Sequence, residues 1–313
     1  MRCLVTGASG HVGSFLVRSL VAQGSEVFAL VRPESDLWRL TGVLDQISLV
    51  KGDLFGDTFP DREIRDAAAE IVFHAAWYGV TGGFRNDEDQ ILKNVPGSLM
   101  LFRAAQEAGC SCWVGIGSQA EYGRVDGILR EEILPKPETA YGVAKNSLRA
   151  LTEKLCEMSG EVRFLWFRLL AAYGPMDDPR HLIPGLIERL LSGERPALTP
   201  GEQRWDYLYI EDAAEAMVRA ALTTGATGVY NLGSGRAEAV RWLAEQIRDA
   251  IDPGLPLGFG EVPYRPDQVM QLQADNSKIQ AATGWRPRIT LEEGLQRTVA
   301  WHQQRRTDAA VGA

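Results

Sequence analysis

The sequence has little of what marks membrane, nucleic-acid-binding or metal-dependent proteins. Its 313 residues carry a formal net charge of −8, so we expect no basic face for the phosphates of a nucleic acid. The longest apolar runs fall far short of a membrane span, and nothing at the N-terminus resembles a signal peptide. The four cysteines and four histidines have neither disulfide nor metal-ligand spacing. We therefore expect a cytoplasmic enzyme with no metal site.

A glycine-rich turn near the N-terminus is the first positive signal. Residues 2–6 predict a strand, three glycines follow, and an apolar pattern with helical period comes next. In dinucleotide-binding folds such glycines permit a tight turn, close approach to a pyrophosphate and close helix–strand packing. The spacing is Gly-x-x-Gly-x-x-Gly rather than Gly-x-Gly-x-x-Gly, but its place between strand and helix supports the same interpretation. The predicted cofactor contacts in this turn are Gly7, Ser9, Gly10, His11, Val12 and Gly13.

Strands and helices then alternate along the chain as far as residue 170. Apolar runs predict strands at 26–31, 47–50, 71–76, 113–117 and 164–169, and helical periodicity covers 88–108 and 141–158. This alternation is typical of an α/β fold with a doubly wound parallel sheet of the Rossmann type. We predict a dinucleotide-binding domain of residues 1–170 with 205–233. Residues 171–204 with 234–313, where Pro and Gly interrupt the rhythm, are predicted to form a smaller, mainly C-terminal substrate-binding lobe.

The residues after the second predicted strand bear on the choice of cofactor. An NAD site usually has Asp or Glu at this strand end, whereas an Arg there accommodates the 2′-phosphate of NADP. Arg32 occupies this place and favours NADP(H), while Glu34 and Asp36 leave NAD(H) open.

Further cofactor contacts are expected at the ends of the next strands. An aspartate after the third strand can reach an adenine amine, and small residues after the fourth let the cofactor lie close to the backbone. A buried helical Asn needs a partner, for which a backbone group near the active site is suitable. These predicted contacts are Asp53, Leu54, Ala75, Ala76 and Asn94. His74 is expected to be a structural strand-end histidine.

Tyr141 and Lys145 carry the predicted chemistry. Four residues apart on a helix, they lie on the same face. A neighbouring ammonium favours the phenolate, so we expect the pKa of Tyr141 to be lowered and its phenol to act as general acid or base. Ser118 follows the strand at 113–117, at the sheet edge where such folds bind ligands. Transfer of a hydride to or from a carbonyl carbon needs a cofactor, and the glycine turn predicts the site that binds it.

Two arginines in the predicted substrate lobe are candidates for binding a diphosphate. Arg204 and Arg265 offer both the charge and the fork geometry that phosphate oxygens require. Ordinary surface ion pairing explains them equally well from the residues alone.

Taken together, the motifs resemble the extended short-chain dehydrogenase/reductases, in particular the nucleotide-sugar epimerase, dehydratase and reductase branch. The resemblance covers nearly the whole chain and rests on Thr6-Gly-Ala-Ser-Gly-His-Val-Gly13, Gly-Asp53-Leu, His74-Ala-Ala, Asn94-Val-Pro-Gly, Ser118-x-x-x-Tyr122-Gly, Tyr141-x-x-x-Lys145, Tyr173-Gly-Pro, Arg204-Trp-Asp-Tyr, Val229-Tyr-Asn-Leu-Gly and Tyr264-Arg-Pro-Asp.

The resemblance implies a role for each of these site residues. Tyr141 is the acid/base, Lys145 holds the cofactor ribose, and Ser118 bonds the reacting sugar oxygen. Arg204 and Arg265 contact the nucleotide diphosphate. The resemblance alone implies a homodimer formed through the helices near 97–109 and 142–158.

Departures from the family pattern narrow the predicted reaction. Ser118-Gln119-Ala120 stands where related 4,6-dehydratases carry Thr-Asp-Glu, so the acid and base needed to eliminate water are missing; Gln119 is counted as a substrate contact. Leu170-Ala171 replaces the frequent Phe-Asn, which leaves the sugar open. Arg32 favours a reductase that consumes NADPH.

These departures predict NADPH-dependent reduction of a keto-sugar nucleotide, in the first place a 4-keto-6-deoxyhexose. An NAD-dependent nucleotide-sugar 4-epimerase is the main alternative. A non-sugar ketone or aldehyde reductase and a non-catalytic cofactor-binding protein are two others, although the latter typically loses the Tyr/Lys pair.

Overall fold

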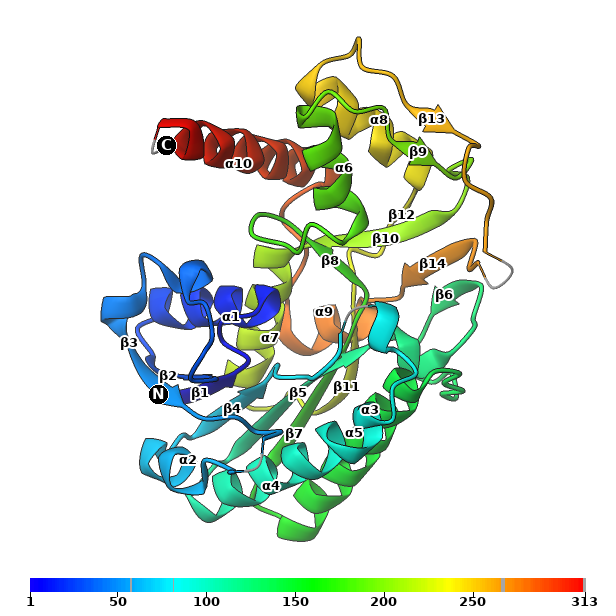
Figure 1. The fold of residues 1–313 in the computed structure, drawn as a ribbon. Helices are drawn as coiled ribbons and strands as arrows, with labels where there is room; N and C mark the ends of the chain where they lie inside the picture. Colours follow the sequence, from blue (N-terminus) through cyan, green and yellow to red (C-terminus); the bar gives the residue numbers. More distant parts are fainter. Residues whose placement is uncertain (57, 81, 266–267, 312–313) are drawn as a thin grey trace.

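The computed structural model describes residues 1–56, 58–80, 82–265 and 268–311, and its centre is a seven-stranded parallel sheet (Figure 1). The strand order is β11-β7-β5-β4-β1-β2-β3. The order reverses between β1 and β4, and a ligand crevice opens at such a point beyond the carboxyl ends of the strands. The predicted doubly wound sheet is confirmed. Its strands are β1 (Arg2–Thr6), β2 (Glu26–Val31), β3 (Ile47–Lys51), β4 (Ile71–His74), β5 (Cys112–Ser118), β7 (Arg163–Leu169) and β11 (Gly228–Leu232).

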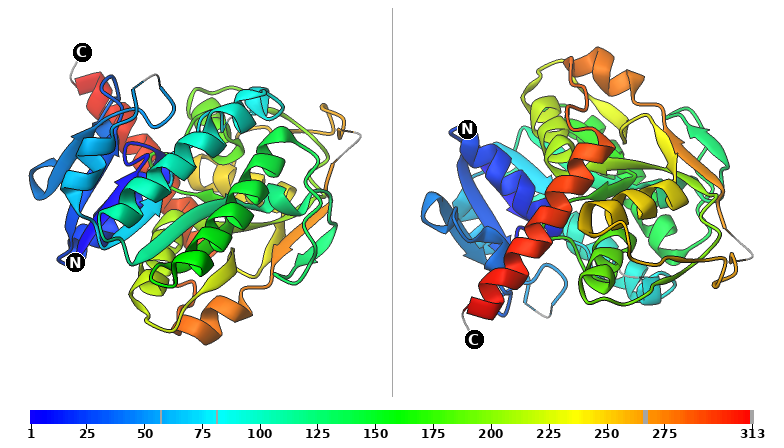
Figure 2. Two further views of the ribbon diagram at one scale, coloured as in Figure 1. Left: turned by 90° about the horizontal axis from the view of Figure 1, so that it is seen from below. Right: turned by 90° about the horizontal axis from the view of Figure 1, so that it is seen from above.

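Helices cover both faces of this sheet, which is why its strands are continuous apolar runs in the sequence. Helices α1 (His11–Ala22) and α7 (Ile210–Leu222) pack on one face; α2 (Asp61–Ala67), α4 (Asn94–Glu107) and α5 (Ala140–Ser159) pack on the other (Figures 1 and 2). Along β1 the side chains alternate between the two layers. Cys3 and Val5 are buried in the cluster that contains α1 and α7, and Leu4 is buried in the opposite one.

The helix that carries Tyr141 and Lys145 has a capping residue at each end. The Thr139 side chain accepts a hydrogen bond from the Gly142 backbone N at 3.1 Å, which satisfies one of the orphan donors of the first turn. Gly160 ends the helix in the left-handed conformation, with φ of +67°. The local sequence therefore determines where α5 begins, and this places Tyr141 in its first turn.

The helix predicted over 88–108 is divided in two. It consists of α3 (Asp89–Leu92) and α4, which meet at Lys93. Asn94 therefore lies at the start of a helix rather than inside one. At that point its side chain can reach back to the segment that follows β4.

The remaining strands form a second layer above the carboxyl edge of the large sheet. Strands β12 (Ala237–Ala239), β10 (Arg204–Tyr209), β14 (Gln271–Ala274) and β6 (Gly127–Leu129) are hydrogen-bonded in that order, and β8 (Ala171–Tyr173) pairs with β10. The pair β9 (Ala197–Leu198) and β13 (Gly258–Phe259) lies beside them. Helices α6 (Leu182–Leu191), α8 (Val240–Ile251) and α10 (Leu291–Val311) pack around this layer (Figure 1).

Two strands of the second layer come from the predicted dinucleotide-binding domain. β6 lies within residues 1–170 of that predicted domain, and β10, which begins at Arg204, continues into its second segment, 205–233. α7 and β11, by contrast, join the large sheet as expected. The two parts thus share chain segments, and the domain boundaries proposed from the sequence remain a prediction.

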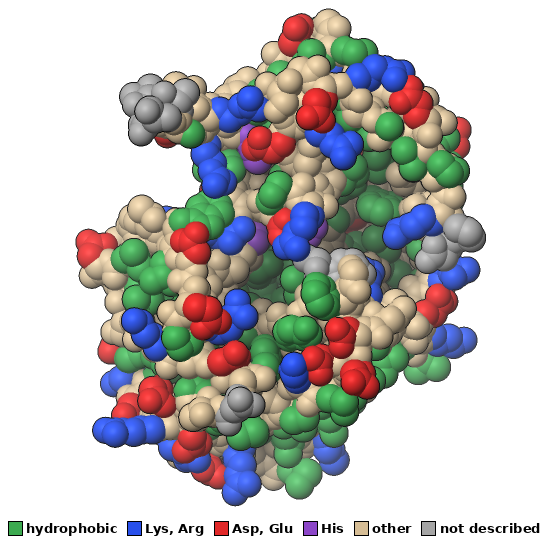
Figure 3. Space-filling model, viewed as in Figure 1, with side chains coloured by type: hydrophobic (Ala, Val, Ile, Leu, Met, Phe, Trp, Pro, Cys, Tyr) green, Lys and Arg blue, Asp and Glu red, His purple; other side chains and the backbone are tan. Residues whose placement is uncertain are grey.

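Helix α10 crosses back over the N-terminal half of the molecule (Figure 2). Trp301 on α10 stacks on Trp38, with ring centroids 6.2 Å apart, so the C-terminal helix is tied to the loop after β2. Between the layers the surface is hollowed (Figure 3). None of the helices in the described part of the chain combines the length and the apolar character needed to cross a bilayer.

Candidate active site

The glycine turn between β1 and α1 has the shape expected of a dinucleotide cradle. Gly7 has φ of +64°, and a Cβ there would lie 2.8 Å from backbone atoms of Ala76. A Cβ on Gly13 would lie 2.1 Å from the Gly7 carbonyl oxygen, so any side chain there would push α1 off the turn. These two positions explain why the turn needs glycine, and they leave its backbone accessible to a phosphate group at the start of α1.

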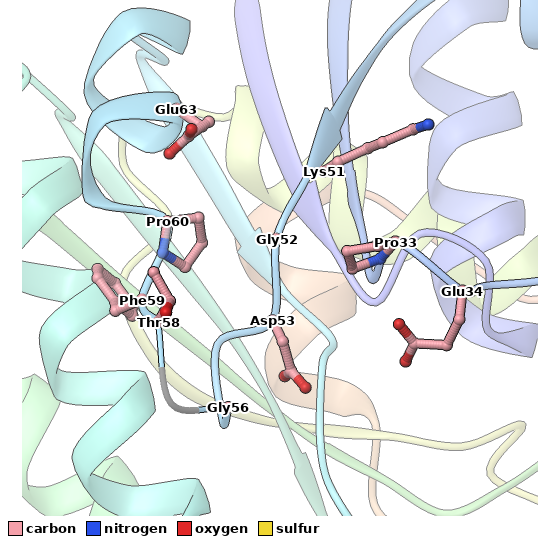
Figure 4. Close-up of a pocket in the computed structure, with 10 residues that line it drawn as sticks. All are labelled: Pro33, Glu34, Lys51, Gly52, Asp53, Gly56, Thr58, Phe59, Pro60 and Glu63. Carbon is pink, nitrogen blue, oxygen red and sulfur yellow. The ribbon is translucent and has the colours of Figure 1, made fainter.

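A cavity of about 410 Å³ opens between the carboxyl ends of β2 and β3 (Figure 4). Glu34 and Asp53 line it from the loops that follow the two strands. The Asp53 side chain also accepts a hydrogen bond from the Phe55 backbone at 2.9 Å, as a turn aspartate does. Arg32 is largely exposed, and its Nε lies 3.4 Å from Glu34 Oε1. The residue on which the NADP prediction rests is thus partly neutralised by a neighbour.

Other predicted cofactor residues take part in protein contacts near the turn. His11 Nδ1 lies 3.2 Å from Asp177 Oδ1, and its Nε2 lies 3.1 Å from the Pro175 carbonyl. The Ser9 carbonyl accepts from Arg39 at 3.4 Å. Leu54 is buried, with its side chain in the core. Whether Val12, Ala75 and the others contact a cofactor remains a prediction.

His74 is structural, as expected. Its ring nitrogens contact Thr6 Oγ1 at 2.9 Å and Ser98 Oγ at 2.7 Å. Burial lowers its pKa to about 3, helped by the charge of Lys145. The ring is therefore neutral at physiological pH and holds β4 to β1 and α4.

Tyr141 and Ser118 meet at the carboxyl edge of β5. Ser118 is the last residue of that strand, and Tyr141 stands in the first turn of α5. Burial raises the pKa of Tyr141 above its usual 10, while hydrogen bonding to Ser118 and the charge of Arg85 oppose the rise. The lowered Tyr141 pKa predicted from the spacing to Lys145 is therefore wrong for the protein without a bound cofactor. The cost of burying a phenolate outweighs the neighbouring positive charges.

The closest contacts of the Lys145 ammonium are with groups other than Tyr141. Its Nζ donates to the Ile116 carbonyl at 2.7 Å and lies 3.7 Å from the ring centroid of Trp77. It is 5.9 Å from the Tyr141 ring centroid. The side chain is 4% exposed, and burial lowers the pKa of Lys145 to about 7, against the opposing charge of Glu121. Its protonation is therefore balanced near neutral pH.

Behind Ser118 lies a buried ion pair that sequence reasoning missed. Glu121 is fully buried and accepts hydrogen bonds at 2.9 Å from the Ser118 backbone, Trp166 Nε1 and Arg168 Nε. The Ser118-x-x-Glu121 spacing, a capping box, was the signal that could have revealed part of it. This network fixes the backbone on which Ser118 is carried.

The segment after β4 supplies two further side chains that the sequence analysis did not single out. Trp77 packs edge-on against Tyr141, with ring centroids 6.1 Å apart. Arg85 lies with its guanidinium carbon 5.8 Å from the Tyr141 ring, and its carbonyl accepts from the Tyr141 backbone at 2.9 Å. Asn94 bonds the backbone N and O of Tyr78, at 2.7 and 3.1 Å. Asn94 thus has the expected backbone partner near the active site.

The predicted substrate residues stand in the second layer or at its border. Arg204 on β10 is half exposed, donates to the Ala237 carbonyl at 2.9 Å and lies 3.7 Å from Glu238. Arg265 is exposed in the loop before β14, and the following Pro266 and Asp267 of its motif lie outside the described residues. Gln119 is half-buried next to Ser118. Contact of these three with a nucleotide sugar remains a prediction.

Comparisons with known proteins show the family to which the chain belongs. Residues 3–233 match the NAD dependent epimerase/dehydratase family. The chain is 27% identical to a dTDP-glucose 4,6-dehydratase of Streptomyces niveus, over 98% of this chain and 94% of the relative. It is 26% identical to a GDP-6-deoxy-D-mannose reductase of Pseudomonas aeruginosa, over 94% and 95%.

A solved structure has the same fold. It is the complex of Thermus thermophilus UDP-glucose 4-epimerase with NAD, which has a TM-score of 0.83 and 26% identity and covers 97% of this chain and 99% of the other. The chain belongs to the NAD dependent epimerase/dehydratase family and is an enzyme of the extended short-chain dehydrogenase/reductase type.

Proposed function

We propose that the protein reduces the keto group of a nucleotide-linked sugar, in the first place a 4-keto-6-deoxyhexose, with NADPH as the reductant. The observation that carries this proposal is the placement of Tyr141 beside Ser118 at the carboxyl edge of β5, with Gln119 and Ala120 next to them instead of an acid and a base. Burial raises the pKa of Tyr141 and so further favours its protonated form. A protonated phenol beside Ser118 suits a reaction that begins by giving a proton to a carbonyl oxygen.

The glycine turn fits a nicotinamide dinucleotide, because Gly7 and Gly13 let the turn pack closely against the segment after β4 and against α1, as the tight turn of such a cofactor site requires. The cofactor would be held by the turn, by the residues lining the cavity after β2 and β3, and by Lys145, and it would supply the hydride. Tyr141 would give its proton to the forming alkoxide. Ser118 would donate a hydrogen bond to the same oxygen and keep it oriented.

Dehydration is disfavoured by the groups around this pair. Gln119 and Ala120 stand beside Ser118, and neither can serve as the acid or the base that the elimination of water requires. The nearest carboxylate along the chain, Glu121, is fully buried and bonded to three donors. A single proton donor is sufficient for a ketone reduction.

An NAD-dependent nucleotide-sugar 4-epimerase is the second candidate, and the position of Arg32 favours it. Its guanidinium pairs with Glu34, whose carboxylate would repel a 2′-phosphate. The T. thermophilus neighbour is an epimerase in complex with NAD.

One set of assays separates the two candidates. The purified protein is incubated with an enzymatically prepared nucleotide-linked 4-keto-6-deoxyhexose and either NADPH or NADH, and absorbance at 340 nm is followed. The proposal expects oxidation of NADPH with formation of one 4-hydroxy epimer. A matched incubation contains UDP-glucose or dTDP-glucose without added reductant. Conversion of these hexoses to their 4-epimers, with no oxidation of NADPH by the keto sugar, would establish the epimerase instead.

We also propose a homodimer formed through α4 and α5. Apolar side chains on these helices are exposed in the single chain: Met100 (49%), Leu151 (43%) and Met158 (72%). Light scattering after size exclusion is expected to give twice the mass of 34.4 kDa, and Leu151→Glu to give the mass of one chain. A single-chain mass for the unmodified protein would contradict the proposal.

A further inference from the structure

Trp77 makes two contacts with the pair that carries the chemistry. Its ring centroid lies 3.7 Å from the ammonium nitrogen of Lys145 and 6.1 Å from the Tyr141 ring, which it meets edge-on at 85°. Lys145 is 4% exposed, so the ring face replaces water on one side of a buried charge. Trp77 itself belongs to the loop that leaves the carboxyl end of β4, within the crevice.

The indole is held in this position by a buried amide. Trp77 Nε1 donates to Gln90 Oε1 at 2.7 Å, and Gln90 is fully buried on α3. Gln90 Nε2 in turn donates to the carbonyls of Gly79 and Phe84, at 2.7 and 3.0 Å. Asn94 donates to Gln90 Oε1 at 3.2 Å. Every hydrogen-bonding group of the Gln90 amide is thus used to fix the segment that presents the ring.

We propose that Trp77 is a positioning residue whose ring keeps Lys145 protonated and directed toward the cofactor. An ammonium has three N–H donors. The Ile116 carbonyl takes one, and the Trp77 ring covers another side, so the donor left over is aimed by these two fixed neighbours. The ring also stabilises the charged form, because its electron-rich face attracts a cation. The inference concerns the state of Lys145 and holds for either reaction considered above.

The charges around Lys145 do not by themselves provide this stabilisation. Burial lowers the pKa of Lys145 to about 7, and the Glu121 carboxylate, already paired with Arg168, is the group whose charge raises it. His74 on β4 is neutral at this pH, and Tyr141 on α5 holds its proton. The Trp77 face therefore adds to the attraction of the Ile116 carbonyl and the Glu121 charge, and at 3.7 Å it is a much closer aromatic neighbour of the ammonium than the Tyr141 ring at 5.9 Å.

The test is an NMR titration of Lys145 in the whole chain, using lysine labelled with ¹³C at Cε and assigned by loss of one signal in Lys145→Met. Trp77→Leu is expected to lower the Lys145 pKa by about 0.5–1.5 pH units, the range that a desolvated cation–π contact corresponds to. Trp77→Phe keeps an aromatic ring that attracts a cation less strongly, so its Lys145 pKa is expected to lie between those of the unmodified protein and Trp77→Leu. The matched control is Phe84→Leu, an exposed aromatic on the same segment, which is expected to leave the titration unchanged.

A second measurement avoids changing the shape of the site. Growth with 5-fluorotryptophan keeps the indole in place but withdraws electron density from its face, so the Lys145 pKa is expected to fall without loss of the fold. Among the contacts found in the described part of the chain, Lys145 is the lysine that lies over a tryptophan ring. An unchanged Lys145 titration in the fluorinated protein would overturn the proposal, whether or not Trp77→Leu folds. The proposal would also be overturned if Trp77→Leu shifted the Lys145 pKa no more than Phe84→Leu does.

Discussion

Glu121→Gln should destabilise the protein far more than its small change in shape suggests. The glutamine carbonyl can still accept from the Ser118 backbone and from Trp166, which both bond Oε1 at 2.9 Å. The lost oxygen is Oε2, which faces Arg168 Nε at 2.9 Å, and the new amide would present a donor to a donor. Arg168 would then keep its charge, 3% exposed, without its carboxylate.

The size of the expected destabilisation follows from the distance between Glu121 Oε2 and Arg168 Nε. A unit-charge pair at 2.9 Å is worth about 6 kcal/mol at an effective dielectric constant of about 20. Removing one partner of a buried pair costs about 3–5 kcal/mol in practice. We expect a loss of that size in the free energy of unfolding, measured by urea denaturation with circular dichroism and tryptophan fluorescence as independent probes.

A double-mutant cycle shows whether the charge is responsible. In Glu121→Gln with Arg168→Met, the unpaired guanidinium is gone, so the double variant should recover about 2 kcal/mol or more relative to the sum of the two single effects. A cost below about 1 kcal/mol for Glu121→Gln, or strictly additive effects, would refute the assignment of a strong buried pair behind Ser118.

The remaining predictions concern the catalytic phenol, the glycine turn and a second carboxylate. Tyr141→Phe should lower kcat by about 10²–10⁴-fold and leave the Kd for NADPH, measured by calorimetry, nearly unchanged; full activity would refute its role. Gly13→Ala should abolish NADPH binding because its Cβ would meet the Gly7 carbonyl at 2.1 Å, whereas Gly225→Ala, with open space around it, should bind normally. Although burial alone would raise it, hydrogen bonds from His11 and His181 hold the pKa of Asp177 well below its usual range, and the partner His181 has a raised pKa. The stability lost in Asp177→Asn should therefore be largest between about pH 4 and 6.5, shrinking below that window as Asp177 takes up a proton and above it as His181 loses one; equal losses at pH 5.5 and 8.5 would exclude the His181 contribution.

The large sheet could be predicted from the sequence because its signal is local and repeated. Parallel strands buried on both faces read as continuous apolar runs, and the glycine turn marks the first crossover. The pairing of β6 with β14 joins residues 127–129 to 272–274, and nothing in either short segment specifies the other. Likewise, the helix is divided at Lys93, next to Asn94, whose side chain bonds the backbone of Tyr78, sixteen residues earlier in the chain.

The placement of Tyr141 and Lys145 on one helix could be predicted, but the pKa shifts of the two groups could not. The i,i+4 spacing places Tyr141 and Lys145 on one face of α5. It does not say that the ammonium makes its closest contacts with the Ile116 carbonyl and the Trp77 ring, which lie more than twenty residues away in sequence. Burial depends on the whole fold, and at this site it outweighs the pairwise attraction that the spacing suggests.

Burial shifts the pKa values of Tyr141 and Lys145 in opposite directions, and in both groups it favours the neutral form. It raises the pKa of Tyr141 and lowers that of Lys145, so it disfavours the charged form of each. A phenol that must give up its proton before turnover would have to overcome this penalty, as it does when a hydroxyl is oxidised. A phenol that gives its proton to a forming alkoxide becomes a buried phenolate only when the hydride is transferred. Uptake of a proton then removes the cost of burying that charge. This asymmetry supports the proposed reduction, and Arg85 and Lys145 are the positively charged side chains that lie close to the Tyr141 ring.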